Sequence, residues 1–364
     1  MALTRTIGII GLGLIGGSIA RALKKSGRTY IVYGCDRQEK VLESALKDKV
    51  IDRICQINDL GDCDAIFLCV PVSGMKPILE ELIVNIKNNC VLTDVGSTKG
   101  DVSRLIDSLG LNGRFIGGHP LAGSEKSGYE ASKSNMFENA YYCLTPTSET
   151  RSEDLEFLKD IVADMGAIPI IMTPEEHDKA TAAISHVPHV VAALLVNMVG
   201  ELDNQDNIMK NIAAGGFKDI TRIASSNPDL WTGICFSNKE MLLNTLSHFS
   251  DGLERFKEIL LNDQKESVNR FFDSARSLRS SISDKIGLIQ KTYDILVDVD
   301  DKPGIIAVIA TALANENINI KNIGIIHSRE TEEGALQIQF ENENASKQGV
   351  KVLTSLGYRV TEKE

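Results

Sequence analysis

A chain of 364 residues with 43% hydrophobic and 24% charged residues has the composition of an ordinary globular protein. Its length exceeds what a single hydrophobic core usually serves, so two or three domains are expected. The formal net charge is −11 at pH 7, and no basic stripe is visible. Because nucleic-acid phosphates need clustered cations, we expect no nucleic-acid partner.

The sequence also argues against a membrane protein, a secreted protein and a metal centre. No run of about 18 apolar residues occurs, and the N-terminus leads into a strand pattern without the features of a signal peptide. The 7 cysteines are odd in number, scattered and without a C-x-x-C pair, unlike a disulfide framework or a structural zinc site. We therefore expect a cytoplasmic protein with no membrane partner and no metal.

Short apolar runs alternate with helix-like stretches from Thr6 to about Met172. This alternation predicts an α/β fold with a mostly parallel, doubly wound, Rossmann-like sheet, which would occupy a first domain over residues 1–173. The expected strands are Ile7–Ile10, Tyr30–Tyr33, Ala65–Val70, Cys90–Thr93, Arg114–Gly118, Ala140–Leu144 and Ile168–Met172.

Strand patterns are absent from about Pro174 to Lys285, so we expect an all-helical domain over residues 174–285. Its many apolar positions predict that it forms a homodimer interface and closes the substrate pocket. The expected helices include Ala180–Met198, Lys239–Leu261 and Asp263–Ser281.

Strand patterns return near the C-terminus. The order β-α-β-β-α-β over residues 291–364 predicts a ferredoxin-like module as a third domain. The expected elements are a strand Tyr293–Val299, a helix to about Asn315, strands Ile318–Ser328 and Gly334–Phe340, a helix Ala345–Leu356 and a strand Tyr358–Thr361.

A Gly-rich turn joins the first expected strand to a helix over Gly17–Lys25. Its sequence is G-x-G-x-x-G, in which Gly11 permits a tight turn, Gly13 lets the backbone approach a pyrophosphate and Gly16 permits close helix packing. The helix N-terminus adds free N–H groups and the positive end of its dipole. We therefore expect residues 1–173 to be a dinucleotide-binding domain.

The expected cofactor is NAD. Asp36 ends the next strand, where a carboxylate can bind the adenine ribose hydroxyls and would repel the 2′-phosphate of NADP. Arg37 acts in the opposite direction, because it attracts a phosphate. The predicted cofactor-binding residues are Gly11, Gly13, Leu14, Ile15, Gly16, Asp36 and Arg37.

Four polar clusters follow this turn. Two come where strands end, at Asp94–Lys99 and Gly117–Glu125, and open α/β sheets bind ligands at such ends. The other two, Ser185–His189 and Gly215–Ala224, lie in the helical part, with Trp231 downstream.

In this order the clusters resemble the prephenate dehydrogenase family of tyrosine biosynthesis, over most of residues 1–285. The specific stretches are His-Pro-x-Ala-Gly-x-Glu from His119 to Glu125 and Asp-x-Thr-Arg-Ile-Ala from Asp219 to Ala224. Members convert prephenate and NAD to 4-hydroxyphenylpyruvate, carbon dioxide and NADH, and some relatives use arogenate. The resemblance implies an NAD-dependent oxidoreductase.

The resemblance implies that His119 is the general base for the ring hydroxyl. A histidine with a pKa near 6.5 suits that task. Ser97 would hydrogen-bond both the hydroxyl and His119. Taken alone, a serine in such a turn is more often a helix cap, so the assignment depends on the joint occurrence of the clusters.

The two carboxylates of prephenate need local cations and donors. Arg222 would bind the ring carboxylate bidentately and His189 would donate to the side-chain carboxylate. Asp219 would orient Arg222, or simply pair with it on a helix surface, while Ser124 and Glu125 would border the pocket. For two further residues, His186 and Trp231, structural and packing roles are expected.

The stretch Asp300–Gly304, followed by a helix and Asn317–Ile320, resembles the ACT domain, which binds amino acids in many regulated enzymes. This implies L-tyrosine as an effector, since the product of the pathway is the natural ligand of a second site. A dimerisation module without a ligand is the alternative. The candidate effector residues are Asp301, Gly304, Asn317 and Asn319.

Alternatives of two classes stay open on sequence alone. Within enzymes, the alternative is an arogenate dehydrogenase, or a related dehydrogenase for a small hydroxy acid with two carboxylates. Assays with prephenate and with arogenate separate prephenate dehydrogenase from arogenate dehydrogenase. A non-catalytic, NAD-responsive regulator is the alternative outside enzymes. The joint presence of Ser97, His119 and Arg222 favours catalysis. Whether one chain supplies the whole site is left open.

Overall fold

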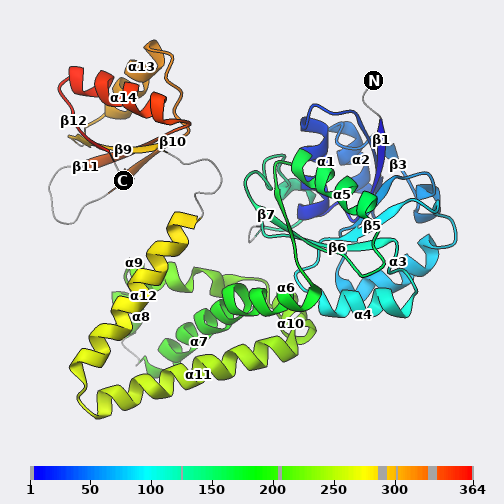
Figure 1. Cartoon of the computed structure of the whole chain (residues 1–364), viewed down its shortest axis with the longest axis horizontal. Helices are drawn as coiled ribbons and strands as arrows, with labels where there is room; N and C mark the ends of the chain where they lie inside the picture. The colour runs from blue at the N-terminus through cyan, green and yellow to red at the C-terminus, as the bar shows by residue number, and fades with distance from the viewer. Residues whose placement is uncertain are drawn as a thin grey trace. The chain divides into compact units, whose positions relative to one another are not determined.

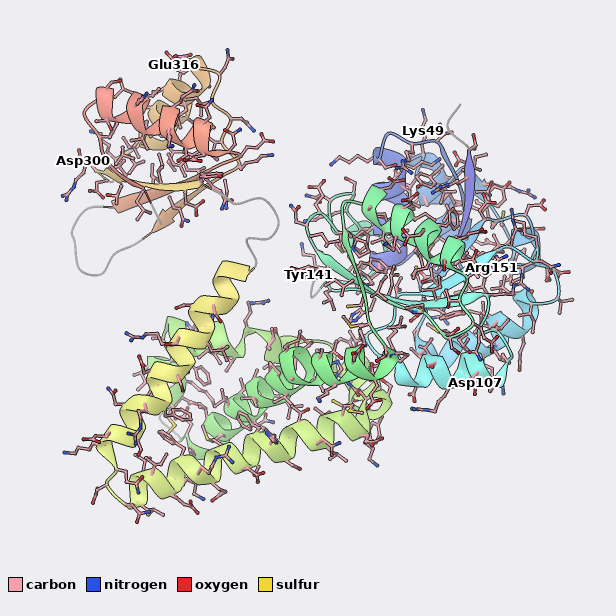
Figure 2. The ribbon with its side chains drawn as sticks, viewed as in Figure 1. Lys49, Asp107, Tyr141, Arg151, Asp300 and Glu316 are labelled. Atoms are coloured by element: carbon pink, nitrogen blue, oxygen red, sulfur yellow. The ribbon has the colours of Figure 1, made fainter. Side chains whose placement is uncertain are left out.

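The computed structural model describes residues 4–123, 126–203, 207–285, 293–300, 302–326 and 334–362. They form two compact units, Met1–Arg255 and Phe256–Glu364, shown as ribbons in Figure 1 and with side chains in Figure 2. The boundary lies inside helix α11 (Lys239–Leu261). The division into domains 1–173, 174–285 and 291–364 stays a prediction.

The N-terminal part of the first unit is built on an eight-stranded sheet in the order β3-β2-β1-β4-β5-β6-β7-β8. All neighbouring strands are parallel except β6 and β7, which confirms the predicted sheet. The strands are β1 (Arg5–Ile10), β2 (Tyr30–Cys35), β3 (Arg53–Ile54), β4 (Ala65–Leu68), β5 (Val91–Asp94), β6 (Phe115–Pro120), β7 (Tyr141–Thr145) and β8 (Ile168–Ile171).

Each face of this sheet carries its own hydrophobic core. In β4 all side chains are buried: Ala65 and Phe67 belong to one core, and Ile66 and Leu68 to the other, as the alternation of side chains along a strand requires. Figure 1 shows the helices on both sides of the sheet. They are α1 (Leu14–Lys25), α2 (Glu39–Lys47), α3 (Met75–Leu82), α4 (Gly100–Ser108) and α5 (Ser152–Asp164).

The topology creates a crevice at the carboxyl ends of the strands. From β1 the chain proceeds outward to β2 and β3, then crosses back to β4 on the other side of β1. Ligands of open α/β sheets bind outside the carboxyl ends of the strands at such a reversal of order. The Gly-rich turn after β1 lies at this position.

After β8 the chain is helical, as predicted. A capping box starts α6, because the Thr173 hydroxyl accepts from the Glu176 N–H at 3.1 Å while the Glu176 carboxylate accepts from the Thr173 N–H at 2.8 Å. The other helices are α8 (Ile208–Ile212), α9 (Gly215–Thr221), η5 (Arg222–Ser225), α10 (Pro228–Ser237) and α12 (Lys265–Lys285).

The predicted helix Ala180–Met198 is not regular. A π-helical segment, η4 (Ala182–His186), separates α6 (Pro174–Thr181) from α7 (Val187–Leu202). The Val187 N–H donates to the Ala182 carbonyl, five residues back. Pro188 explains the widening, because proline lacks an N–H and its ring clashes with the carbonyl four residues earlier.

The C-terminal module has a four-stranded antiparallel sheet in the order β10-β11-β9-β12, which confirms the ferredoxin-like prediction. The strand expected at Ile318–Ser328 begins later, at Asn322, because Asn317 has a left-handed φ of 56° and turns the chain first. The elements are β9 (Tyr293–Val299), α13 (Ile305–Asn315), β10 (Asn322–Ile326), β11 (Gly334–Phe340), α14 (Glu343–Ser355) and β12 (Arg359–Glu362).

Candidate active site

The Gly-rich turn fits a dinucleotide at the start of α1. Gly11 has a φ of +93°, and a β-carbon at Gly16 would lie 2.0 Å from the Gly11 carbonyl oxygen, so both positions require glycine. Space is open around Gly13, where no atom lies within 4 Å of a built β-carbon. No side chain caps α1 and no acid lies in its first turn, which leaves the N–H groups at Leu14 and Ile15 for an anion.

Asp36 follows β2 and faces this turn. Its Oδ2 accepts the Leu12 N–H at 2.8 Å and its Oδ1 accepts the Gln38 N–H at 2.9 Å. The carboxylate is therefore held beside the turn with lone pairs left for ribose hydroxyls. Arg37 is exposed. This donor and acceptor set is the one that NAD needs.

A buried carboxylate, that of Asp94, organises the ends of two other strands of the sheet. Asp94, the last residue of β5, forms an ion pair with the buried Lys99. Its Oδ2 also accepts the Gly96 N–H at 2.8 Å, and its Oδ1 accepts the Gly118 N–H at 3.0 Å. One side chain therefore ties the loop after β5 to strand β6.

Ser97 and His119 lie on the two elements that Asp94 joins. Ser97 is in the loop after β5, His119 is in β6, and both are half-buried. The hydrogen bonds of the described residues do not include one between them, so the hydrogen bond of Ser97 to His119 stays a prediction. The Nδ1 atom of His119 is instead engaged by Nε2 of His177 at 2.8 Å.

His177 and its neighbour Asp178 were missed by the sequence analysis. Both are in α6 and both are buried. His177 Nδ1 lies 2.8 Å from Asp178 Oδ1, and the same carboxylate accepts the backbone N–H groups of Lys99 and Gly100, each at 2.7 Å. Burial alone would raise the pKa of Asp178, but these hydrogen bonds outweigh it and lower the pKa below its usual value.

His119 is held as a neutral imidazole. Burial lowers its pKa well below the usual value, and the positive charge of Lys99 lowers it further, as do His177 and His186. A neutral ring has one nitrogen free to accept a proton. The surroundings therefore provide a base that is not already protonated at neutral pH.

A second group of rings lies in the helical part. The His189 ring stacks on Trp231 with a centroid separation of 3.6 Å, and the His186 ring meets Trp231 edge-on at 6.0 Å. His189 Nδ1 donates to the Ser185 carbonyl at 2.9 Å, which leaves Nε2 for a ligand. Burial lowers the pKa of His189, the Ser185 bond opposes this, and the nearby Arg222 charge adds to the lowering.

The expected structural role of His186 agrees with its surroundings. It is 2% exposed, and its Nδ1 lies 3.2 Å from Asn238 Nδ2. The same Asn238 amide donates to the backbone carbonyl of Asp178 at 2.8 Å. His186 thus contacts Asn238, the residue between α10 and α11, which in turn binds the backbone of α6.

For the remaining candidate residues, the structure gives mainly their element and their exposure. Arg222 begins η5 and is exposed, as is Asp219 in α9. Among the effector candidates, Gly304 has a φ of +91° at the start of α13, and Asn317 and Asn319 are exposed. Three predicted residues, Ser124, Glu125 and Asp301, lie outside the described residues.

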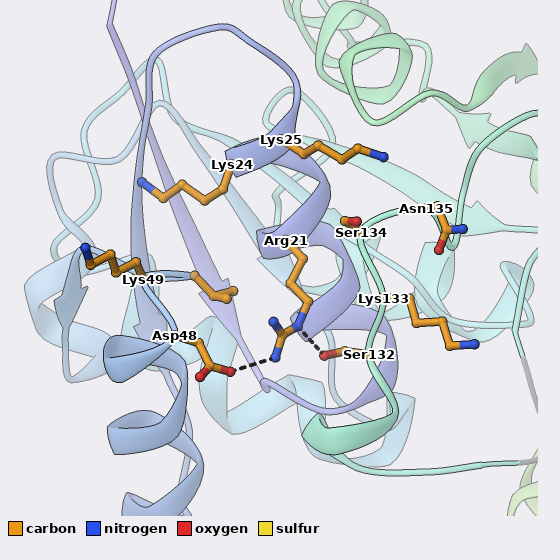
Figure 3. Close-up of a pocket in the computed structure, with 10 residues that line it drawn as sticks. Arg21, Lys24, Lys25, Asp48, Lys49, Ser132, Lys133, Ser134 and Asn135 are labelled. Carbon is orange, nitrogen blue, oxygen red and sulfur yellow. Dashed lines mark hydrogen bonds and ion pairs between the residues drawn. The ribbon is translucent and has the colours of Figure 1, made fainter.

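A separate hollow of about 550 Å³ lies beside α1, away from these groups, and Figure 3 shows its cationic lining. Its charges are largely neutralised: Arg21 binds Asp48 and Ser132, each at 2.9 Å, and Lys25 pairs with Glu138 at 3.1 Å. These contacts fasten the segment after His119 to α1.

Family models match three consecutive parts of the chain. Residues 19–172 match the nucleotide-binding domain of prephenate dehydrogenase, and residues 173–274 match its dimerization domain. The chain belongs to the prephenate dehydrogenase family. Residues 295–358 match the ACT domain of the acetohydroxyacid synthase (AHAS) small-subunit type, which agrees with the predicted module at the C-terminus.

Individual members of the prephenate dehydrogenase family match over most of the chain. The prephenate dehydrogenase of Bacillus subtilis (strain 168) is 40% identical over 347 residues, which is 94% of each chain. The structure of prephenate dehydrogenase from A. aeolicus with hydroxyphenyl propionate and NAD+ has a TM-score of 0.71 and 33% identity, covering 76% of this chain and 98% of that one. Synechocystis arogenate dehydrogenase has a TM-score of 0.70 and 32% identity, covering 76% and 99%.

Proposed function

We propose that the chain oxidises prephenate to 4-hydroxyphenylpyruvate, carbon dioxide and NADH. The observation that carries this proposal is the neutral His119 at a strand end, on the strand that Asp94 joins to the loop of Ser97, in a sheet whose first strand leads into a turn built for a dinucleotide. NAD bound at that turn would accept a hydride from the ring carbon that bears the hydroxyl. The B. subtilis and A. aeolicus relatives, by their names, support prephenate as the substrate.

His119 has a defined task in this reaction. Its free ring nitrogen accepts the hydroxyl proton as the carbon is oxidised, and the Ser97 hydroxyl holds the substrate oxygen in place. The resulting ring ketone then loses its carboxylate as carbon dioxide, because the bonding electrons complete an aromatic ring. The proton returns from His119 to the phenol oxygen, so that no net proton is released.

The proposal predicts a loss of the chemical step when His119 is replaced. His119→Ala is expected to lower kcat by about 10²–10⁴-fold, the usual contribution of a general base. The measurement is NADH formation with saturating prephenate and NAD. Turnover close to that of the wild type would remove His119 from this role.

Arg222 and His189 are proposed to bind the two carboxylates of prephenate. Arg222→Ala should raise the KM for prephenate by about ten- to hundredfold, since a charged hydrogen bond contributes roughly 1.5–3 kcal/mol. Arg222→Lys keeps the charge but loses the bidentate geometry and should give an intermediate value. An equal rise in the KM for NAD would indicate a structural role instead.

Arogenate is the second candidate substrate, and the similarity to the Synechocystis arogenate dehydrogenase is the observation that favours it. Initial rates with prephenate and with arogenate, each measured with NAD and with NADP, decide which substrate and which cofactor the enzyme prefers. We expect prephenate with NAD to give the highest kcat/KM, because the Asp36 carboxylate would face a 2′-phosphate.

We also propose a homodimer formed by the helical part. Large apolar side chains are exposed there, including Leu194 at 57%, Ile212 at 71% and Phe236 at 72%, more than a monomer usually exposes. The match to a dimerization domain supports this proposal.

By length and composition, one helix of the described residues, Pro174–Leu202, is apolar enough to cross a membrane. Its first turns carry His177 and Asp178, and Asp178 bonds to the backbone of the nucleotide-binding part, which argues for contact with protein rather than lipid. We infer a soluble, cytoplasmic enzyme.

L-Tyrosine is the proposed effector. The ACT match supports an amino-acid site in the C-terminal module, and binding there must differ between two states of the enzyme to change its rate. The test compares tyrosine inhibition of the wild type and Asn319→Ala. Unchanged, purely competitive inhibition in the variant would place tyrosine in the substrate site.

A further inference from the structure

Two buried groups continue a line of hydrogen bonds that begins at the half-buried proposed base. His119 Nδ1 lies 2.8 Å from His177 Nε2, and His177 Nδ1 lies 2.8 Å from Asp178 Oδ1. His177 is 0% exposed and Asp178 is 5% exposed. The line starts in β6 of the nucleotide-binding part and ends in α6 of the helical part.

The partners fix which nitrogen of each ring carries a proton. A carboxylate only accepts hydrogen bonds, so His177 Nδ1 must be the donor to Asp178. In the tautomer that carries its single proton on Nδ1, the His177 ring has its lone pair on Nε2 and accepts from His119 Nδ1. His119 consequently carries its proton on Nδ1 and its lone pair on Nε2.

We propose that His177 and Asp178 are positioning residues that set the tautomer of His119, so that its Nε2 faces the substrate hydroxyl as an unprotonated base. This inference rests on the proposed role of His119. Neither residue touches the reacting atoms. Their effect passes through one hydrogen bond to the His119 ring.

The line of hydrogen bonds from His119 to Asp178 also stabilises the positive charge that forms on His119 during the reaction. When His119 accepts the hydroxyl proton it becomes an imidazolium, and Lys99 lies close enough to disfavour that charge. The Lys99 ammonium is already paired with Asp94. The Asp178 carboxylate, reached through the His177 ring, is therefore the negative group that stabilises the imidazolium through this chain.

Asp178 is itself held by the backbone rather than by another side chain. Its two oxygens accept the N–H groups of Lys99 and Gly100, each at 2.7 Å. A β-carbon at Gly100 would lie 2.9 Å from Asp178 Oδ2, so a side chain there would displace the carboxylate. The start of α4 thus fixes the carboxylate that orients the two rings.

Asp178→Asn is the direct test. An asparagine NH2 group in place of Oδ1 gives up the bond from the Lys99 N–H, donates to His177 Nδ1 and reverses both tautomers, which would leave a proton on His119 Nε2. We expect kcat to fall by about 10²–10⁴-fold, with the KM values for NAD and prephenate changed less than about threefold.

His177→Gln is the second variant, because it leaves the contacts of Asp178 with the backbone in place. The glutamine carbonyl still accepts from His119 Nδ1 but transmits no negative charge, so the loss of kcat should be smaller than in Asp178→Asn.

Thr181→Val is the matched control. The buried Thr181 hydroxyl donates to the His177 backbone carbonyl at 3.0 Å. Because it lies outside the line from His119 to Asp178, kcat should be unchanged in this variant.

A double-mutant cycle separates this inference from the assignment of His119. In the His119→Asn background, Asp178→Asn should cause no further loss of kcat, because it acts only through His119. The same fold loss in both backgrounds would overturn the positioning role, as would wild-type kcat in both Asp178→Asn and His177→Gln. A fully active His119→Asn would instead overturn the proposed base.

Discussion

Two glycines of the Gly-rich turn differ in what surrounds them. A β-carbon at Gly16 would lie 2.0 Å from the Gly11 carbonyl oxygen, whereas at Gly13 nothing lies within 4 Å. Packing therefore requires glycine at position 16. At position 13, glycine matters only when a ligand occupies the open space.

These surroundings predict opposite effects of the same substitution. Gly13→Ala should keep the thermal midpoint of the wild type but raise the KM for NAD by about tenfold or more, equivalent to about 1.4 kcal/mol. Gly16→Ala should lower the midpoint, because a carbonyl must move. Thermal unfolding and initial rates measure both. A destabilised Gly13→Ala with an unchanged KM would contradict the assignment.

His186 predicts how stability depends on pH. Burial lowers its pKa to about 4, with a raising effect from Asp178 and lowering effects from His177 and His189, against about 6.5 in an unfolded chain. The folded state therefore binds fewer protons between these values. Stability is complete above about pH 6.5 and is lost as the pH falls towards 4.

At pH 5 we expect His186 to lower the free energy of unfolding by about 2 kcal/mol relative to pH 7. Urea unfolding of the wild type and of His186→Asn at both pH values measures this loss. The difference between the two pH values should be smaller in the variant by that amount. An equal loss of stability in both proteins would show that groups other than His186 cause the decrease in stability at acid pH.

At the residue scale, sequence predicted those site residues that belong to local patterns. The Gly-rich turn and Asp36 follow from spacing along one strand, turn and helix. His177 and Asp178 escaped detection because they stand in a polar first turn that resembles a solvated helix start. Their partners, His119 and the Lys99 backbone, are 58 and 79 residues away, and no short-range pattern reveals such contacts.

At the scale of elements, the π-helical segment η4 determines how α6 and α7 are rotated relative to one another. It contains one residue more than a regular turn would, and one residue corresponds to a rotation of about 100°. His177 lies before it and His189 after it. Such segments often occur at functional sites, and we expect the extra residue to set the rotation of His189 relative to His177.

Deletion of Ile184 tests this rotation, because its side chain is 69% exposed and its removal should turn α6 by about 100° relative to α7 while Pro188 stays in place. We expect kcat/KM for prephenate to fall about hundredfold or more through misplacement of the site, with the helical circular-dichroism signal retained. The control Ile184→Ala should remain active. An active deletion variant would show that the register is unimportant.

Long or strongly patterned elements were predicted well and short ones were not. Lys239–Leu261 and Tyr293–Val299 have the predicted bounds, because each is one uninterrupted amphipathic pattern. The strand β3 has two exposed residues, too few for any periodicity. The interruption at η4 arises from Pro188, whose effect reaches backwards along the chain and leaves the hydrophobic pattern unbroken.

At the scale of the whole molecule, sequence indicated a parallel sheet, a helical part and a ferredoxin-like module, but not the strand order. The antiparallel pairing of β6 with β7 is set by the long connection that follows His119, which is fastened to α1 through Ser132 and Tyr129. Such a path depends on tertiary contacts and leaves no mark in strand periodicity.

The exposed apolar surface predicts the oligomeric state. Sedimentation equilibrium should give about twice the chain mass of 39.7 kDa, and Leu194→Glu should shift this towards the monomer, because a buried unpaired charge opposes association. Leu46→Glu in α2, which is 42% exposed, is the matched control and should remain dimeric. A monomeric wild type would contradict the proposed interface.

The contact between Asp178 and the start of α4 has an evolutionary consequence. If the tautomer of His119 is set from α6, then the nucleotide-binding part does not carry a self-sufficient base. A protein made by fusing residues 1–173 to a new partner would keep the affinity for the cofactor. In its His119 ring, however, neither nitrogen would be fixed as the one that carries the proton. We infer that selection acts on residues 1–173 and the first turns of α6 as a single heritable unit, and that successful chimeras between family members will have crossovers beyond Asp178.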